Sequence, residues 1–453
     1  MKRKLFLVFC VVFLLIGAIS VLSACSTEEG GSAISSVSVN EAGELIVTYK
    51  NGETESLGVV VGRDGEDGRD GEDGKDGKDG ADGMNGSILI TNEKTDISYA
   101  ASKGLRSAVS IVCGFETTVQ VGGWFPGYGG TTTKEYSSLG SGVIYSMTRS
   151  EGDAFIITNY HVVYDAASNS ENGISEDISV YLYGSELEEM AIPAEYVGGS
   201  LFYDIAVLHI DNSDLIRTSD ACEADIADSD LLSVGDQAIA IGNAKGYGIS
   251  TSSGIISVDS EYLDMVAADG KTAVSYRVMR VDTAVNSGNS GGGLFDNEGN
   301  LIGIVNAKII DEGVENIGYA IPSNVAVSVA DNIIHYCYET EVERVQRAML
   351  GITVATSDSR AVFDSETGKI YIKESVSIHE TAEGSPADGI LMAGDILISA
   401  SVGDRCTEIN RRYHIIDMML DVRAGDTVSL TVIRDGAEMT LEIPITSDCL
   451  AAY

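Results

Sequence analysis

Proline, basic residues and paired cysteines are scarce in this chain. Its 453 residues include five prolines and one tryptophan, and 69 Asp and Glu residues outnumber 29 Lys and Arg residues, giving a net charge of −40. So acidic a chain lacks the cationic side chains that neutralise nucleic-acid phosphates or anionic lipid headgroups. The composition therefore argues against a nucleic-acid partner and against electrostatic attachment to a membrane.

The seven cysteines show neither a metal pattern nor a disulfide pattern. Cys10 lies in an apolar N-terminal run and Cys25 follows it, while the others are widely spaced: Cys113, Cys222, Cys337, Cys406 and Cys449. This odd set without CxxC pairs gives no zinc-ligand spacing and no disulfide framework. We therefore expect buried thiols, no metal and no organic cofactor.

Long apolar runs are absent except at the N-terminus. Residues 1–24 begin with basic residues, continue as an apolar run and end in small residues before Cys25. This order is that of a secretion signal, and the cysteine predicts a lipoprotein signal peptide with lipid on Cys25. An ordinary signal peptide or an uncleaved helix is the alternative. No later stretch is long enough to cross a bilayer, so the lipid would anchor the chain outside the cytoplasm, on a bacterial cell membrane.

Two unusual segments follow a polar tether at 25–33. Residues 34–61 alternate in the manner of strands, with a turn at Asn51-Gly52, and predict a small β-module. Glycine then recurs at every third position across 62–88. Such Gly-X-Y periodicity is typical of collagen, because only glycine fits the triple-helix axis. Since this run contains no proline, a hydrophilic spacer is the alternative to a collagen-like triple helix.

A glycine-rich turn between two expected strands offers a candidate nucleophile. Ser290 lies in the stretch Asn286-Ser287-Gly288-Asn289-Ser290-Gly291-Gly292-Gly293. Glycines allow a tight turn with inward-facing N–H groups, which can stabilise a developing oxyanion. We expect an oxyanion hole at Gly288, Asn289 and Ser290, with the N–H groups of Gly288 and Ser290 as donors. An ordinary Gly/Ser/Asn turn is the alternative.

Two other stretches supply a general base and its partner. His161 lies at the end of an apolar run that begins at Phe155, and Asp204 opens the apolar run 205–208. Histidine exchanges protons near neutral pH, and a buried carboxylate fixes its tautomer. Of the five histidines, only His161 has this strand-end position. The order and spacing of His161, Asp204 and Ser290 suit two successive β-barrels and predict a catalytic triad.

The strings TNYHVV, DIAVLHI, NSGNSGGGLFD and IGYAIPS resemble the HtrA/Deg family of serine proteases. The resemblance spans roughly residues 100–448. It implies a mainly β fold, with a chymotrypsin-like double β-barrel over 95–335 and a PDZ domain over 345–448. Two residues depart from the family pattern: Tyr160, where a small or amide residue is usual, and Ser287, where proline is common. Ser287 would loosen the turn of the oxyanion hole.

The resemblance also implies substrate sites. In chymotrypsin-like folds the residue six positions before the nucleophile lies at the base of the specificity pocket, and here it is Ala284, beside Val285. Small or medium aliphatic residues are therefore expected before the cut, rather than Lys or Arg. Leu350-Gly351-Ile352 matches the PDZ turn whose backbone N–H groups bind a C-terminal carboxylate. A β-domain serving only as a spacer is the alternative.

Together these features predict an extracytoplasmic serine endopeptidase that cleaves unfolded or misfolded proteins and binds C-terminal peptides. The resemblance implies a homotrimer, with activity gated by ordering of the loops around Gly288 and Asn289. The aromatic loop 122–133 would be a regulatory loop, a subunit contact or a plain surface loop. A proteolytically inert chaperone or scaffold is one alternative function, and a cell-surface structural protein built on the Gly-X-Y segment is another.

Overall fold

The computed structural model describes residues 34–40, 42, 44–59, 97–121, 130–185, 187–307, 317–340, 342 and 345–453. The chain divides into two compact units, residues 1–89 and 90–453. The predicted signal peptide, Cys25, the tether, the Gly-X-Y segment and most of the aromatic loop lie outside the described residues. In the described part, no helix is long and apolar enough to cross a membrane.

The first unit contains a three-stranded antiparallel sheet with the order β1-β2-β3. The strands are β1 (Ile34–Val39), β2 (Glu44–Tyr49) and β3 (Thr54–Val59). At the turn between β2 and β3, Gly52 has a φ of +90°, and its N–H donates to the carbonyl of Tyr49 at 2.9 Å. The glycine takes the left-handed conformation that this turn requires.

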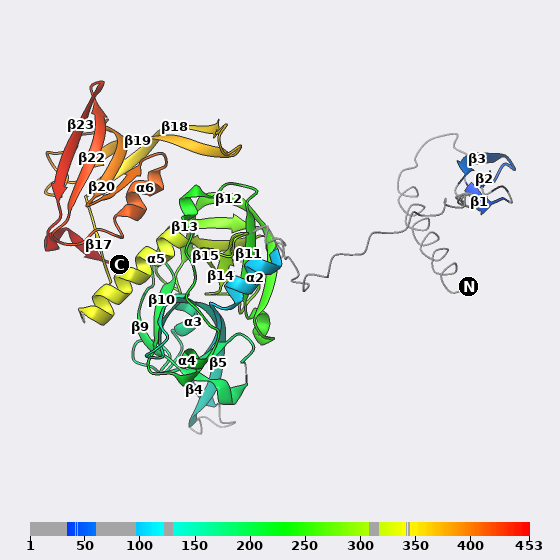
Figure 1. Ribbon diagram of the computed structural model, residues 1–453, viewed down its shortest axis with the longest axis horizontal. Helices are drawn as coiled ribbons and strands as arrows, with labels where there is room; N and C mark the ends of the chain where they lie inside the picture. Colours follow the sequence, from blue (N-terminus) through cyan, green and yellow to red (C-terminus); the bar gives the residue numbers. More distant parts are fainter. Residues whose placement is uncertain are drawn as a thin grey trace, which may run out of the picture. The chain divides into compact units, whose positions relative to one another are not determined.

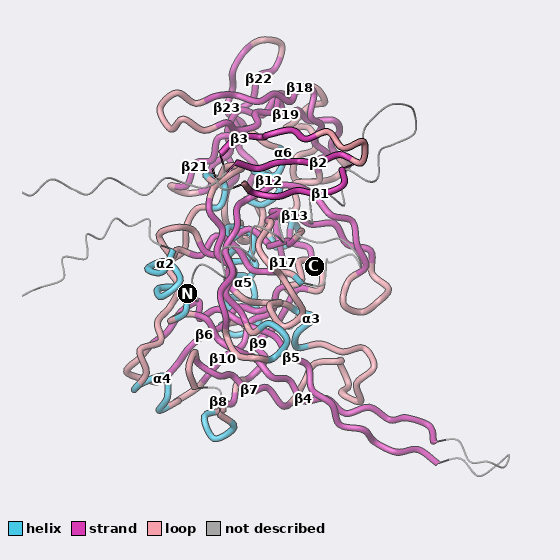
Figure 2. Tube along the Cα trace, turned by 90° about the vertical axis from the view of Figure 1, so that its right-hand side faces the viewer, coloured by secondary structure: helices cyan, strands magenta, loops and turns pink. Residues whose placement is uncertain are grey.

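The second unit begins with helix α2 (Ile97–Leu105) and a seven-stranded antiparallel sheet with the order β8-β7-β4-β5-β6-β10-β9. Its strands are β4 (Ala108–Val121), β5 (Gly130–Thr148), β6 (Asp153–Thr158), β7 (Asp177–Leu182), β8 (Ile192–Pro193), β9 (Glu195–Ser200) and β10 (Ile205–Ile210). Isoleucine and valine dominate its core, because β-branched residues pack well on a pleated surface. The hairpin of β4 and β5 projects beyond the sheet (Figure 2).

A closed barrel follows, with the order β11-β12-β13-β16-β15-β14. Its strands are β11 (Gln237–Gly242), β12 (Ser250–Val266), β13 (Ala273–Val281), β14 (Gly293–Phe295), β15 (Leu301–Val305) and β16 (Gly318–Pro322). Closure removes the free edges that an open sheet exposes. Short helical segments lie between the strands of the sheet and the barrel: α3 (Tyr160–Val163), η1 (Glu188–Met190), α4 (Asp214–Thr218), η2 (Ser229–Leu231) and η3 (Ala244–Gly246).

Helix α5 (Ser323–Ile333) leaves the barrel, continues as the π-helix η5 (Ile334–Glu339), and lies between the barrel and a C-terminal sheet (Figure 1). That sheet has the order β18-β19-β20-β22-β23, with β21 paired to β20, and a separate ribbon pairs β17 with β24. The elements are β17 (Gln346–Ala348), β18 (Ile352–Phe363), β19 (Ile370–Thr381), β20 (Ile396–Val402), β21 (Arg405–Glu408), α6 (Arg412–Met418), β22 (Thr427–Arg434), β23 (Ala437–Pro444), η6 (Ser447–Cys449) and β24 (Leu450–Ala452).

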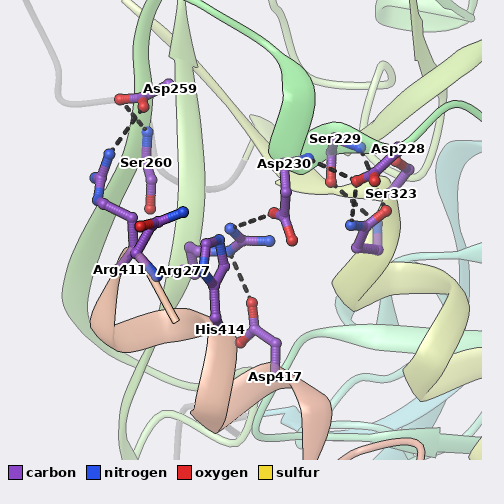
Figure 3. Close-up of polar contacts among 12 residues, drawn as sticks. Asp228, Ser229, Asp230, Asp259, Ser260, Arg277, Ser323, Arg411, His414 and Asp417 are labelled. Atoms are coloured by element: carbon purple, nitrogen blue, oxygen red, sulfur yellow. Dashed lines mark hydrogen bonds and ion pairs between the residues drawn. The ribbon is translucent and has the colours of Figure 1, made fainter. Parts of the chain in front are cut away.

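A buried arginine joins helix α6 to the barrel (Figure 3). Arg277 in β13 is 2% exposed, and its guanidinium lies 2.8 Å from Asp230 Oδ1 and 3.0 Å from Asp417 Oδ2. The same guanidinium lies 3.9 Å from the centre of the Tyr413 ring. Burial raises the pKa of Asp417 to about 6, although the positive charge of Arg277 opposes the rise. A cavity of about 610 Å³ lies beside this cluster, and none of the candidate site residues lines it.

Candidate active site

His161 and Asp204 contact each other through two hydrogen bonds. His161 Nδ1 lies 2.7 Å from Asp204 Oδ2, and the backbone N–H of His161 donates to Asp204 Oδ1 at 2.9 Å. His161 lies in α3, just after β6, and Asp204 lies just before β10. Since β6 and β10 pair in the sheet, their ends bring the two side chains together.

The backbone of Asp204 adopts a left-handed conformation, with a φ of 54°. This region is disfavoured for residues with a Cβ, although Asp tolerates it better than most. Its carbonyl accepts hydrogen bonds from the Tyr160 N–H at 3.1 Å and from Asn159 Nδ2 at 2.9 Å. These contacts hold the conformation that directs the carboxylate at His161.

Asn306, which sequence reasoning missed, also contacts the carboxylate. Its Nδ2 donates to Asp204 Oδ2 at 2.9 Å and to the hydroxyl of Tyr276 at 3.0 Å. Asn306 is fully buried directly after β15, and a donor here stabilises the charged carboxylate. Burial raises the pKa of Tyr276 well above its usual value, and the negative charge of Asp204 adds to the rise. The sequence signal that could have found it is an asparagine directly after the apolar run 301–305.

Ser290 lies between β13 and β14 and is 5% exposed. Its carbonyl accepts a hydrogen bond from the Ser141 N–H at 2.8 Å. Gly288 has a φ of +96°, and a Cβ there would lie 2.3 Å from the Asn243 carbonyl oxygen, so only glycine fits. In the described part of the chain, no direct hydrogen bond joins the Ser290 hydroxyl to the His161 ring.

The predicted oxyanion donors differ in their contacts. The N–H of Asn289 donates to the Asn286 carbonyl at 3.0 Å, whereas the N–H groups of Gly288 and Ser290 donate to no acceptor among the described residues. Ser141 Oγ donates to the Gly288 carbonyl at 2.7 Å. Ser141 thus contacts both sides of the turn, a role that its sequence context did not reveal.

The predicted specificity residues lie on the segment before this turn. Ala284 is exposed, and its carbonyl accepts from Ser252 Oγ at 3.0 Å. Val285 is partly buried and packs against the barrel core. The carboxylate of the nearby Asp282 accepts a hydrogen bond from the backbone N–H of Ile255 in β12 at 2.7 Å.

The Leu350 turn lies at the start of the C-terminal sheet. Leu350 is buried, and Gly351 has a φ of +69°. The Gly351 carbonyl accepts from the Ala382 N–H at 2.8 Å, and Ile352 begins β18. β18 is an edge strand of its sheet and lies against α6.

The five cysteines that the structure describes are free thiols that differ in exposure. Cys113 is buried, and burial raises the pKa of its thiol to about 12. Cys406 in β21 is exposed, so the expectation of buried thiols is wrong for this residue: among the strands that the structure describes, β21 pairs with β20 alone and lies off the main path of the sheet. Within the described ranges, no group of three or more His, Cys, Asp or Glu side chains could hold a metal ion.

Comparisons with known proteins show which families and proteins this chain is similar to. The family model "Trypsin-like peptidase domain" matches residues 140–304. The serine protease Do-like HtrA of Lactococcus lactis subsp. cremoris (strain MG1363) is 32% identical over 370 residues, covering 78% of this chain and 83% of that protein. The periplasmic pH-dependent serine endoprotease DegQ of Escherichia coli (strain K12) is 30% identical over 68% of this chain and 60% of its own length.

A solved structure of the HtrA-type protease AlgW with decapeptide covers 79% of this chain and 98% of its own, at 24% identity and a TM-score of 0.46. The family assignment depends instead on the sequence relatives. Because the Lactococcus relative exceeds 30% identity across most of both chains, and the trypsin-like model matches the segment that carries His161 and Ser290, this chain belongs to the HtrA/Deg family of serine proteases.

Proposed function

We propose that Ser290, His161 and Asp204 form the catalytic triad of this serine endopeptidase. The observation that carries the proposal is the distance of 2.7 Å between His161 Nδ1 and Asp204 Oδ2. With Nδ1–H donated to the carboxylate, Nε2 is left as the basic nitrogen. It takes the proton of Ser290 Oγ as the oxygen attacks the substrate carbonyl, then gives it to the leaving amine. Water hydrolyses the acyl-enzyme by the same route in reverse.

The N–H groups of Gly288 and Ser290 bind the oxyanion. Both are without an acceptor in the described part of the chain, whereas the N–H of Asn289 is donated to Asn286. Asn289 therefore contributes to the shape of the turn rather than a donor. Protease activity is gated by ordering of this turn. The presence of Ser287 supports this, because serine leaves the backbone less constrained than the proline that is common in the family.

The substrates are unfolded or misfolded proteins cut after small or medium aliphatic residues. Two facts support this proposal. Ala284 carries no charge to pair with Lys or Arg, and the carboxylate of Asp282 is hydrogen-bonded to the backbone of β12. An extracytoplasmic location with a lipid on Cys25 is supported by the N-terminal sequence and by the word "periplasmic" in the name of the Escherichia relative.

The C-terminal region (345–448) acts as a PDZ domain that binds C-terminal peptides at Leu350, Gly351 and Ile352. Two observations support this: the left-handed Gly351 and the free edge of β18 beside α6. A peptide added as a strand to β18 would place its carboxylate at this turn. Assembly as a homotrimer rests on the family resemblance.

The deciding experiment compares the full chain with its Ser290→Ala variant. Both are incubated with unfolded casein and with a fluorophosphonate probe, with and without peptides that have hydrophobic C-termini. We expect cleavage and labelling by the wild type only, with faster cleavage when peptide is present. Cleavage by the alanine variant would refute Ser290 as nucleophile, and a lack of peptide response would refute the assignment of the PDZ turn.

A further inference from the structure

Tyr203, the residue before Asp204, lies between β9 and β10 and contacts two residues that do not belong to their sheet. It is 5% exposed, and its hydroxyl accepts a hydrogen bond from Arg347 Nη1 at 2.7 Å. Its ring meets that of Tyr453 edge-on, with the centroids 5.4 Å apart. Two residues distant in sequence thus contact the neighbour of the candidate catalytic acid.

Arg347 lies in β17, and Tyr453 directly follows β24, the strand that pairs with β17 in a two-stranded ribbon. Arg347 pairs with Ala451 in this ribbon, and the N–H of Tyr453 donates to the Val345 carbonyl at 3.2 Å. β17 precedes the C-terminal sheet in the chain, and β24 follows it. The ribbon therefore joins both ends of that sheet to the segment that carries Asp204.

The hydroxyl of Tyr453 contacts a residue of helix α5. Its hydroxyl accepts from Asn332 Nδ2 at 3.1 Å, and the same amide donates to the Leu420 carbonyl at 2.6 Å. Asn332 is fully buried in α5. The guanidinium of Arg347 lies 5.7 Å from the centre of the Tyr453 ring. Tyr453 is thus held beside Tyr203 by contacts at its backbone, ring and hydroxyl.

We propose that Arg347 and Tyr453 are positioning residues for Asp204. By holding Tyr203, they stabilise the left-handed backbone at Asp204 that directs the carboxylate at His161. The inference depends on the proposed triad, because its effect on the reaction requires Asp204 to orient His161. A displacement of about 1 Å in a catalytic group can cost roughly 100-fold in rate, so partial loss of this support should be measurable.

The test uses the full chain and a short chromogenic peptide. Arg347→Met, Tyr453→Ala and Tyr203→Phe should each lower kcat by about 10-fold per active site titrated with fluorophosphonate, with KM changed less than about twofold, because the ribbon does not touch substrate. Tyr453→Phe keeps the ring and should restore most of kcat. Arg347→Met combined with Tyr203→Phe should be no worse than either alone, since both remove the same hydrogen bond.

Lys369→Met is the matched control. Lys369 Nζ lies 2.7 Å from Asp236 Oδ2. This ion pair joins the turn between β18 and β19 to the residue before β11 and does not involve Tyr203. This variant should keep the wild-type kcat. Equal losses in Lys369→Met and Arg347→Met would refute the inference, because any weakened contact between sheet and barrel would then suffice. Variants with a lower Tm but wild-type kcat per titrated site would refute it as well.

A second measurement does not need cleavage. The proton between His161 Nδ1 and Asp204 Oδ2 should resonate downfield of the amide protons in the NMR spectrum of the intact protein. We expect Arg347→Met and Tyr453→Ala to shift or broaden this signal, and Lys369→Met to leave it unchanged. An unchanged signal in all variants would refute the positioning role, whereas a wild type with the signal but without cleavage or labelling would refute the proposed catalytic function alone.

Discussion

Replacing Asn306 with alanine removes a hydrogen bond to the carboxylate that contacts His161. Asn306 Nδ2 lies 2.9 Å from Asp204 Oδ2 in a fully buried site. A hydrogen bond to a charged group contributes about 1.5–3 kcal/mol, and each 1.36 kcal/mol corresponds to about tenfold in rate. We therefore expect kcat/KM to fall by roughly 10- to 100-fold, mostly through kcat, because in the proposed triad Asn306 acts through Asp204 and does not touch the substrate.

The assay is steady-state hydrolysis of a short peptide, normalised to sites titrated with fluorophosphonate. Tyr276→Phe removes the second acceptor of the Asn306 amide, at 3.0 Å. This neutral hydrogen bond contributes about 1 kcal/mol, so the loss should be about fivefold at most. Tyr262→Phe is the matched control, because the Tyr262 hydroxyl is buried and has no hydrogen-bond partner in the described part of the chain.

The reasoning is refuted if Asn306→Ala keeps the wild-type kcat/KM at an unchanged Tm. It is also refuted if Tyr262→Phe loses as much activity as Tyr276→Phe, since any buried tyrosine would then matter equally.

Three further changes test other parts of the structure. Gly288→Ala should abolish peptide hydrolysis, because its Cβ would lie 2.3 Å from the Asn243 carbonyl oxygen; measurable turnover would contradict this conformation of the proposed oxyanion-hole turn. Arg277→Met leaves Asp230 and Asp417 without their cation and should lower the free energy of unfolding in urea by about 3–5 kcal/mol. The pKa of Asp417 is raised from 3.8 to about 6, so its favourable contribution is present below pH 3.8 and lost as pH rises to about 6. The stability of the wild type relative to Asp417→Asn should therefore fall across this window and stay level above it.

Local sequence was sufficient to select the main candidate residues. Apolar runs ending at His161 and beginning after Asp204 predicted strand ends, and the glycines around Ser290 predicted a tight turn. The pattern was less accurate about detail, because His161 lies in a short helix after β6 rather than at the end of the strand itself. This difference is small because hydrophobic periodicity locates elements better than their ends.

Sequence by itself determined the acidity of the chain, the strand-rich pattern of its second unit and the identity of the His, Asp and Ser candidates, since each has a signature within a few neighbouring residues. Only the tertiary structure decided what surrounds them. The contacts of Asn306 and Tyr276 with Asp204, and of Arg347 and Tyr453 with Tyr203, join residues far apart in the chain. Such contacts depend on how sheets and helices pack, and packing between distant segments leaves no local pattern in the sequence.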